Sequence, residues 1–392
     1  MKRTLIITGV CFPPVVVGTA VLLGNLFKYF PPDSYYALMG RLDHIWQFKD
    51  IPSTMPCKYY HTRYPIIQGK GWRYYRSIFR ELALILLIAW KGARIVRREG
   101  VEVLFAVTNC EMEAAALLIH WLTRKPLILY LPDLYYAPGR TVPKWIKFVQ
   151  RLLEPALMRS AETVLVANTA TQEYYHNKYG RHAEVLPHSV ALDRYVPMAE
   201  TSDRKGGGLT ILFTGEVSAA QLDAVLNMVK VVNAFQDLNA KFVVVSNIGP
   251  EILRQMGVDG PNVICRQASR DEIPSLQQEA DVLFLPLAFS WPCPEIIRTA
   301  SPSKMPEYLA AGRPILVHAP DFSYVAGYAR EEGFGLVVDE PDIEQLRQAV
   351  LTLRDNREII SRLVTNAQKT ARKHDVERIS ERLQQILDMS TR

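Results

Sequence analysis

Short apolar runs alternate with helical stretches along almost the whole chain. The runs LIIT, VEVLFAV, LILYL and TVLVAN in the first half, and LTILFTG, KFVVVSN, DVLFLPL and PILVHAP in the second, show no regular polar alternation. Strands of this kind are buried on both faces, which is typical of parallel sheets covered by helices. The pattern predicts two doubly wound, Rossmann-like α/β domains that face each other across a cleft.

The two series of strands are separated by a segment rich in charge and glycine, DRYVPMAETSDRKGGG. We therefore predict a first domain over residues 1–197, a linker over 198–208 and a second domain over 209–373. The final stretch, residues 374–392, predicts a helix with Ile379, Leu383 and Leu387 on one side. We expect this helix to cross back and pack on the first domain.

Composition limits the class of protein. Hydrophobic residues make up 48% and charged residues 22%, as in ordinary soluble globular proteins. A net charge of +6 suits phosphorylated ligands or an anionic lipid surface, and is too small to indicate nucleic-acid binding. The five cysteines are scattered, with no pair at metal-ligand spacing, which indicates a reducing, cytoplasmic compartment and no structural zinc.

Two apolar segments resemble membrane anchors. Residues 5–27 carry no charge, but a double proline at Pro13 and Pro14 favours a strand, a loop and then a helix from about Ala20 over a spanning helix. The run LALILLIAW, residues 82–90, is too short to span a bilayer as a helix. We expect it to form a buried helix.

A basic and aromatic segment precedes this second run. Lys70, Arg73, Arg76 and Arg80 are interleaved with tyrosines and a phenylalanine over residues 70–80. Such a flank would suit an anionic membrane surface, with the protein peripheral on its inner face. The alternative is a core helix that has a solvated basic end.

One segment, SPSKMPEYLAAGRPILV (residues 301–317), predicts a helix with an unusual start. Gly312 suits the left-handed position after the helix, and Pro306 is tolerated within the first turn. Ser303 is then the predicted N-cap, which puts Lys304 and Glu307 in the first turn. Free N–H groups and a lysine at this point predict a site for an anion such as phosphate.

This segment resembles the donor site of family 4 retaining glycosyltransferases of the GT-B architecture. Further segments resemble the same family in order and spacing: TGVCFPPVVVGTAVLLGNL, YLPDLYYAP, EVLPHSVALDRYVP, ILFTGEV and ADVLFLPL. The resemblance covers nearly the whole chain. It implies a nucleotide-sugar donor and a glycan or lipid-linked acceptor.

The resemblance also implies roles for three side chains. Glu307 corresponds to the glutamate that holds the ribose hydroxyls, and Lys304 would neutralise the diphosphate. Asp133, directly after a predicted strand, would orient the acceptor hydroxyl. The alternatives are a glutamate that only complements the helix dipole, a solvated surface lysine and an Asx-turn aspartate.

The chain departs from the family pattern at two places. Thr299 stands where the family often has a second glutamate, and residues 216–221 lack the basic pair that clamps phosphates. Other cationic side chains and backbone N–H groups must then complete the donor site. The candidates are Arg266, Arg298, Thr299, Ser303, Gly18, Thr19 and Gly215.

The sequence thus predicts transfer of a sugar with retention of configuration, and the leaving diphosphate could accept the acceptor's proton. No Asp-x-Asp motif occurs in the second domain, so we expect neither a metal nor another cofactor. Two alternatives stay open. A nucleotide-sugar 2-epimerase would turn over the donor without an acceptor, and an inactive glycan-binding homologue would not turn it over at all.

Overall fold

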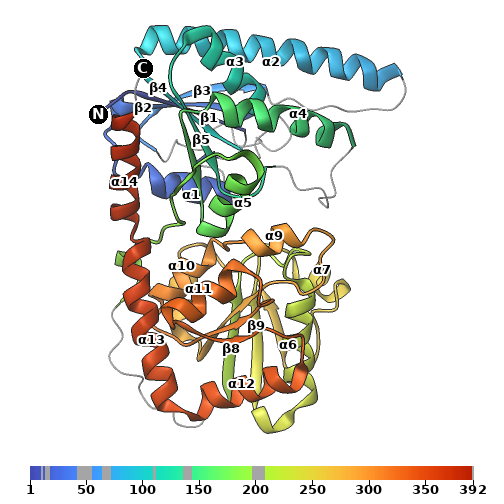
Figure 1. Ribbon diagram of the computed structural model, residues 1–392. Coiled ribbons are helices and arrows are strands. Elements are labelled where there is room, and N and C mark those ends of the chain that lie inside the picture. The colour runs from blue at the N-terminus through green and yellow to red at the C-terminus, as the bar shows by residue number, and fades with distance from the viewer. Residues whose placement is uncertain are drawn as a thin grey trace. The chain divides into compact units, whose positions relative to one another are not determined.

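The computed structural model describes residues 1–9, 12–13, 18–41, 55–63, 72–108, 112–135, 144–196 and 208–390. The chain forms two compact units (Figure 1): Met1–Ser189 with Val376–Arg392, and Val190–Asp375. The division falls after Ser189 instead of at residue 197. Except for Gly208, the predicted linker lies outside the described residues.

The first unit is built on a parallel sheet. Within the described residues it has seven strands in the order β3-β2-β1-β4-β5-β6-β7. The strands are β1 (Thr4–Thr8), β2 (Tyr35–Arg41), β3 (Lys58–Arg63), β4 (Val103–Val107), β5 (Leu127–Leu131), β6 (Thr163–Val166) and β7 (Glu184–Val185). Every residue of β1, β4 and β5 is buried, as their uninterrupted apolar sequences predict.

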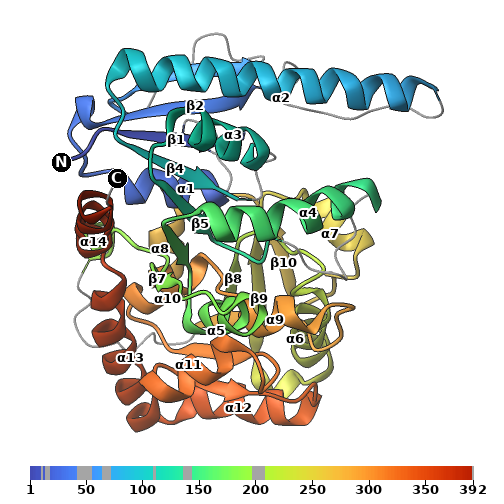
Figure 2. The same ribbon diagram turned by 45° about the horizontal axis from the view of Figure 1, so that its top comes forward.

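Helices cover both faces of this sheet (Figures 1 and 2). On one face lie α2 (Trp72–Glu99), α3 (Glu113–Thr123) and α4 (Lys144–Ser160), and on the other α1 (Gly18–Leu26) and α14 (Val376–Met389). The helix α5 (Thr169–Tyr179) joins β6 to β7. The connection from β1 to β2 moves toward one edge of the sheet, whereas the connections after β3 move toward the opposite edge. Because crossovers between parallel strands are right-handed, α1 lies on the face opposite to α2, α3 and α4.

The C-terminal helix α14 is part of the first unit. Its apolar side chains Ile379, Leu383, Ile386 and Leu387 are buried in the same core as the side chains of α1 and the sheet. These residues follow the stripe that the sequence indicates, and the core holds them although they come from the end of the chain.

The second unit contains another parallel sheet, with six described strands in the order β10-β9-β8-β11-β12-β13. They are β8 (Leu209–Thr214), β9 (Ala240–Val245), β10 (Val263–Arg266), β11 (Val282–Pro286), β12 (Ile315–His318) and β13 (Gly335–Val338). All described strand pairs in both sheets are parallel, which confirms the predicted pair of doubly wound domains.

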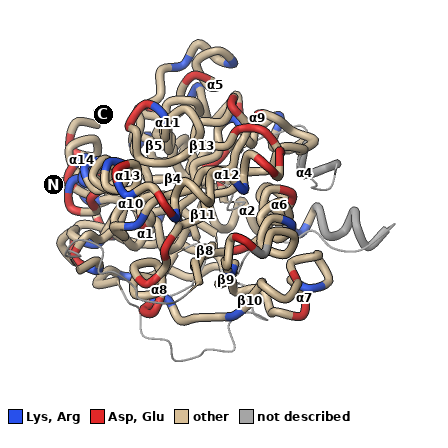
Figure 3. The backbone as a smooth tube through the Cα atoms, turned by 90° about the horizontal axis from the view of Figure 1, so that it is seen from below, with Lys and Arg blue, Asp and Glu red and all other residues tan. Residues whose placement is uncertain are grey.

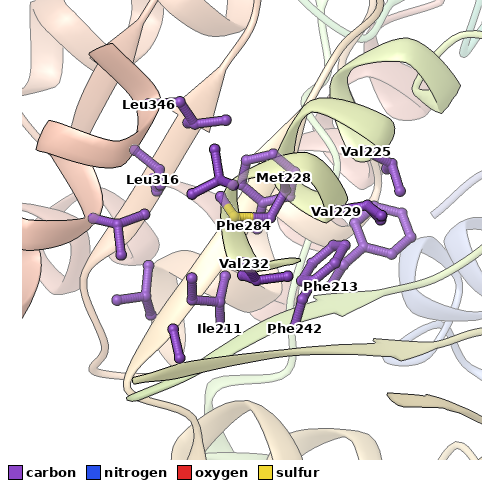
Figure 4. Close-up of a cluster of buried hydrophobic side chains, with 14 of the residues drawn as sticks. Ile211, Phe213, Val225, Met228, Val229, Val232, Phe242, Phe284, Leu316 and Leu346 are labelled. Carbon is purple, nitrogen blue, oxygen red and sulfur yellow. The ribbon is translucent and has the colours of Figure 1, made fainter. Parts of the chain in front are cut away.

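Eight α-helices are described in the second unit: α6 (Leu222–Ala234), α7 (Pro250–Gln255), α8 (Ile273–Glu279), α9 (Pro294–Thr299), α10 (Lys304–Ala310), α11 (Tyr324–Glu332), α12 (Ile343–Asp355) and α13 (Arg357–Ala371). Its core includes Phe213, Phe242 and Phe284 from three adjacent strands, packed against Met228 of α6 and Leu346 of α12 (Figure 4). Charged residues of both signs are interspersed over this unit (Figure 3), and Arg347 pairs with Asp237 and Glu344.

The prediction of a buried helix over residues 82–90 is wrong. This run belongs to the longer helix α2, on which Leu82, Leu86, Leu87 and Trp90 are exposed. Ile88, Ala89 and Ala93 of the same helix are buried. No helix within the described ranges is both long enough and apolar enough to cross a membrane.

Candidate active site

The helix α10 begins where the sequence predicts, after β11 and the short helix α9. Gly312 has φ +70° just past its end, which confirms the left-handed turn into β12. Ser303 occupies the N-cap position, but its side chain makes no capping hydrogen bond. The predicted N-cap position is therefore confirmed, but the backbone of Ser303 is helical, with φ −59° and ψ −21°, whereas a capping hydroxyl requires an extended backbone.

The amine of Lys304 lies over the face of an aromatic ring. Its Nζ is 3.6 Å from the ring centroid of Phe213, and burial lowers its pKa to about 7. Gly215, with φ +114°, leaves room for the lysine, since a Cβ there would come within 3.1 Å of the lysine Cε. Within the described part of the chain, Lys304 makes no hydrogen bond or ion pair, so its charge is available to a ligand.

Glu307 accepts a hydrogen bond from a fully buried amide. Nε2 of Gln277 lies 3.3 Å from Oε2 of Glu307 and 3.1 Å from Oγ1 of Thr214. The hydroxyl of Tyr195 donates to Oε1 of Gln277 at 2.7 Å. Because Tyr195 satisfies the amide oxygen, the amide nitrogen is directed at Glu307 and holds that carboxylate in one orientation.

Two arginines add positive charge around this carboxylate. Burial raises the pKa of Glu307, while the bond from Gln277 and the charges of Arg270, Arg194 and Lys304 act in the opposite direction. Arg194 also donates to the backbone oxygen of Arg270 at 3.0 Å. Arg194 also lies 3.4 Å from a carboxylate oxygen of Asp271. The site therefore combines Glu307 with three nearby cations, which suits a ligand that carries both hydroxyl and phosphate groups.

A buried tyrosine fixes the position of α10 against the sheet. The backbone N–H of Thr214, the last residue of β8, donates to the hydroxyl of Tyr308 at 2.8 Å. This bond ties the helix to the carboxyl end of β8, where Gly215 follows. Ligands of doubly wound folds bind at the carboxyl ends of the strands.

Three predicted donor residues lie elsewhere or are engaged otherwise. The guanidinium of the exposed Arg298 lies 5.3 Å from the ring centroid of Phe322. Thr299 is buried and its hydroxyl donates to the backbone oxygen of Glu295 at 2.8 Å. Arg266 ends β10 with its side chain exposed. No described contact joins these three side chains to Lys304 or Glu307.

The remaining predicted residues belong to the first unit. Asp133 is exposed two residues after β5. Gly18 and Thr19 begin α1, and a Cβ on Gly18 would meet no heavy atom within 4 Å. All three lie near the carboxyl ends of strands in the first sheet, the edge at which such folds bind ligands.

Sequence reasoning missed the side chains that surround Glu307. Arg194 and Tyr195 were assigned to the start of the linker segment, while Arg270 precedes α8 and Gln277 lies within it. Their sequence carries no metal or phosphate motif that would single them out. Within the described ranges, no group of three or more histidine, cysteine, aspartate or glutamate residues is placed to hold a metal ion.

A known family matches part of the chain. Residues 208–356 match the family described as Glycosyl transferases group 1. No curated protein has a sequence that matches the chain.

Solved structures share the fold over nearly the whole length of the chain. Anabaena HepE in complex with UDP-glucose is 14% identical, with a TM-score of 0.69 over 99% of this chain and 100% of HepE. Sucrose-phosphate synthase from Thermosynechococcus elongatus is 13% identical, with a TM-score of 0.71 over 98% of each chain. A Listeria monocytogenes protein assigned as a UDP-N-acetylglucosamine 2-epimerase is 13% identical, with a TM-score of 0.58 over 98% of this chain and 95% of that one.

The chain therefore has the two-domain GT-B fold of these structures, and residues 208–356 resemble a glycosyltransferase family. The match to the family lies in the second unit, which also holds Lys304 and Glu307.

Proposed function

We propose that this protein is a family 4 retaining glycosyltransferase that moves a sugar from a nucleotide diphosphate donor to a hydroxyl group of a glycan or lipid-linked acceptor. We place this activity in the cytoplasm, in cell-envelope or exopolysaccharide synthesis. The observation that carries the proposal is the presence of Lys304 and Glu307 in one helical turn, beside the carboxyl end of β8. The complex of HepE with UDP-glucose supports a nucleotide-sugar as the donor.

Glu307 would bind the ribose. A carboxylate accepts two hydrogen bonds and a vicinal diol donates two, so the chemistry of the two groups matches. Gln277 occupies one oxygen only, and at 3.3 Å, which leaves capacity for the diol. Burial raises the pKa of Glu307, and the bond from Gln277 and the charges of Arg270 and Arg194 oppose that rise.

Lys304 would stabilise the diphosphate. Negative charge on the diphosphate grows as the glycosidic bond breaks, so a fixed cation lowers the barrier more than it strengthens ground-state binding. The ring of Phe213 holds the amine in place without neutralising it. Arg194 and Arg270 join the proposed phosphate contacts. The earlier donor candidates Arg266, Arg298, Thr299, Ser303, Gly215, Gly18 and Thr19 stay predictions.

Asp133 would orient the acceptor hydroxyl, and the leaving diphosphate would take the proton of that hydroxyl on the same face of the sugar. This arrangement gives retention of configuration. It uses the donor's own phosphate as the base, so we propose a reaction without metal or other cofactor. Unchanged transfer in the presence of a chelator would support this, and loss of transfer that magnesium or manganese restores would refute it.

A 2-epimerase is the second candidate, because the Listeria protein assigned to that class has a similar fold. An epimerase converts the nucleotide-sugar without an acceptor, whereas a transferase requires one. Product analysis of the purified protein with donor alone separates the two. Donor that is neither hydrolysed nor converted, with or without acceptors, would instead indicate an inactive glycan-binding homologue.

The decisive experiment replaces Glu307 by glutamine. A thermal-shift panel of nucleoside diphosphates first identifies the base, since a ligand at 100 times its Kd adds about 2.7 kcal/mol to the free energy of unfolding. Glu307→Gln should then weaken binding of that diphosphate about tenfold to a hundredfold, because a charge-assisted hydrogen bond contributes about 1.5–3 kcal/mol. Isothermal titration calorimetry measures the change.

Glu279→Gln is the matched control, because Glu279 is an exposed glutamate at the end of α8. It should bind like the parent. If Glu307→Gln also binds like the parent, the carboxylate only complements the helix start and the proposed ribose contact is wrong.

A further inference from the structure

The helix layer formed by α2, α3 and α4 exposes most of the large apolar side chains found on the surface. Among the described residues, seventeen such side chains are exposed, and ten of them lie on these three helices. Monomeric soluble proteins rarely expose apolar residues in such a concentration without a binding role. We call the outward side of these three helices the outer helical face.

On α2 the exposed residues form a stripe. Phe79, Leu82, Leu86 and Trp90 follow one another at helical spacings of three or four residues, and Phe79 and Trp90 are 72% and 54% exposed. The stripe continues in the same spacing to Arg94, whose guanidinium lies 4.6 Å from the ring centroid of Trp90. One side of this helix thus passes from apolar to cationic.

The other two helices extend the same surface. The helix α3 packs between α2 and α4, and all three lie on one side of the first sheet (Figures 1 and 2). Trp121 and Leu122 are exposed on α3, and Phe148, Val149 and Leu152 are exposed on α4. Exposed apolar side chains therefore occur on all three helices of this layer.

The positive charge of the protein is concentrated in these helices. Together they contain 11 lysine and arginine residues and four acidic residues. The rest of the chain contains 35 lysine and arginine residues and 36 acidic residues. Two of the four acidic residues, Glu113 and Glu154, are buried, and Glu154 bonds inward to Lys178 and Tyr179. The entire positive excess thus lies in the helix layer that carries the exposed apolar side chains.

We propose that the outer helical face docks on the surface of an anionic lipid bilayer. Apolar and tryptophan side chains enter the interface between headgroups and acyl chains, and arginines bind the anionic headgroups. A second copy of the chain would bring two positive faces together, which like-charge repulsion disfavours. The docking face includes Phe79 and Arg80 of the predicted segment 70–80, and extends well beyond it to α3 and α4.

This inference is independent of the proposed sugar transfer, because its test needs neither donor nor acceptor. The test is flotation of the full chain with vesicles of phosphatidylglycerol and phosphatidylcholine, compared with vesicles of phosphatidylcholine alone. The parent should float with the anionic vesicles only. Binding should weaken as salt rises, since the screening length falls from about 10 Å at 0.1 M to about 3 Å at 1 M.

Two variants test the two components of the surface. The double variant Leu86→Glu with Trp90→Glu should lower partitioning about a hundredfold or more. It replaces two apolar side chains that would enter the bilayer interface by carboxylates, which carry the same sign of charge as the lipid. Ile252→Glu makes the same kind of change at an exposed residue of α7 and should float like the parent. Arg94→Gln with Arg97→Gln should lower partitioning on anionic vesicles about twenty- to thirtyfold.

Circular dichroism and thermal unfolding establish whether the variants fold. If the glutamate variant does not fold, the arginine variant alone tests the proposal. A parent that does not float, or that floats equally with phosphatidylcholine alone, overturns the proposal. Unchanged flotation of a folded variant also overturns it. Sedimentation velocity detects the other occupant: a dimer that Leu86→Glu with Trp90→Glu dissociates would assign the face to a second copy.

Discussion

Raising the pH through 7 is expected to weaken binding of the nucleoside diphosphate. Burial lowers the Lys304 pKa from 10.5 to about 7, so the free protein loses the ammonium charge above that pH. The diphosphate selects the charged form. Above pH 7 the proton must be taken up on binding, and each further pH unit costs about 1.36 kcal/mol, a tenfold rise in Kd, until the pKa of the bound state is reached.

The stability of the unliganded protein should change in the opposite direction. The folded-state pKa of Lys304 lies below the ordinary value of 10.5, so the unfolded chain binds more protons between about pH 7 and 10.5. The free energy of unfolding attributable to this group therefore rises with pH across that window, while the affinity for the diphosphate falls. No other role for the lysine predicts both trends.

Calorimetry in buffers of different ionisation enthalpy measures the coupled proton. At about one pH unit above the lysine pKa, binding should take up nearly one proton per site. Lys304→Met should abolish the uptake and flatten that component of the pH profile, whereas Lys230→Met, at an exposed lysine of α6, should change neither. The reasoning is refuted if Lys304→Met leaves the proton uptake and the pH profile unchanged.

Two further predictions concern the backbone beside the site and the C-terminal helix. Gly215→Ala should displace the Lys304 amine, because the new Cβ would come within 3.2 Å of Nζ and a φ of +114° strains any residue with a side chain. The pH profile of diphosphate binding should then shift. A profile identical to that of the parent would contradict the described contact between Gly215 and Lys304. Leu383→Ala should lower the free energy of unfolding of the first unit by about 2–5 kcal/mol, measured by denaturant unfolding, and the exposed Gln385→Ala should change it little.

The fold was predictable because its signal is local. The strands of the second unit are four to six residues long and mostly apolar, and the sequence alone marks most of them. The turn after α10 was equally predictable, since Gly312 supplies the positive φ that other residues rarely adopt. The placement of Lys304 and Glu307 in the first turn of α10 followed from their spacing of three residues.

The surroundings of Glu307 depend on contacts between distant parts of the chain. Tyr195 and Gln277 are 82 residues apart, and Gln277 and Glu307 are 30 apart. No periodicity or motif indicates such a network, because it exists only when the sheet brings these segments together. The exposed side of α2 was missed for a related reason: an apolar run does not tell which of its side chains will contact the sheet.

The structure also changes the physical account of the predicted anion site. The helix α10 has only seven residues, and a helix terminus carries only about half an elementary charge. The cations around it are stronger determinants: Lys304 is held over Phe213, and Arg194 and Arg270 act on Glu307. Burial disfavours the charged form of Lys304 until a diphosphate binds. In the proposed mechanism the side chains recognise the diphosphate, and the start of α10 positions these side chains.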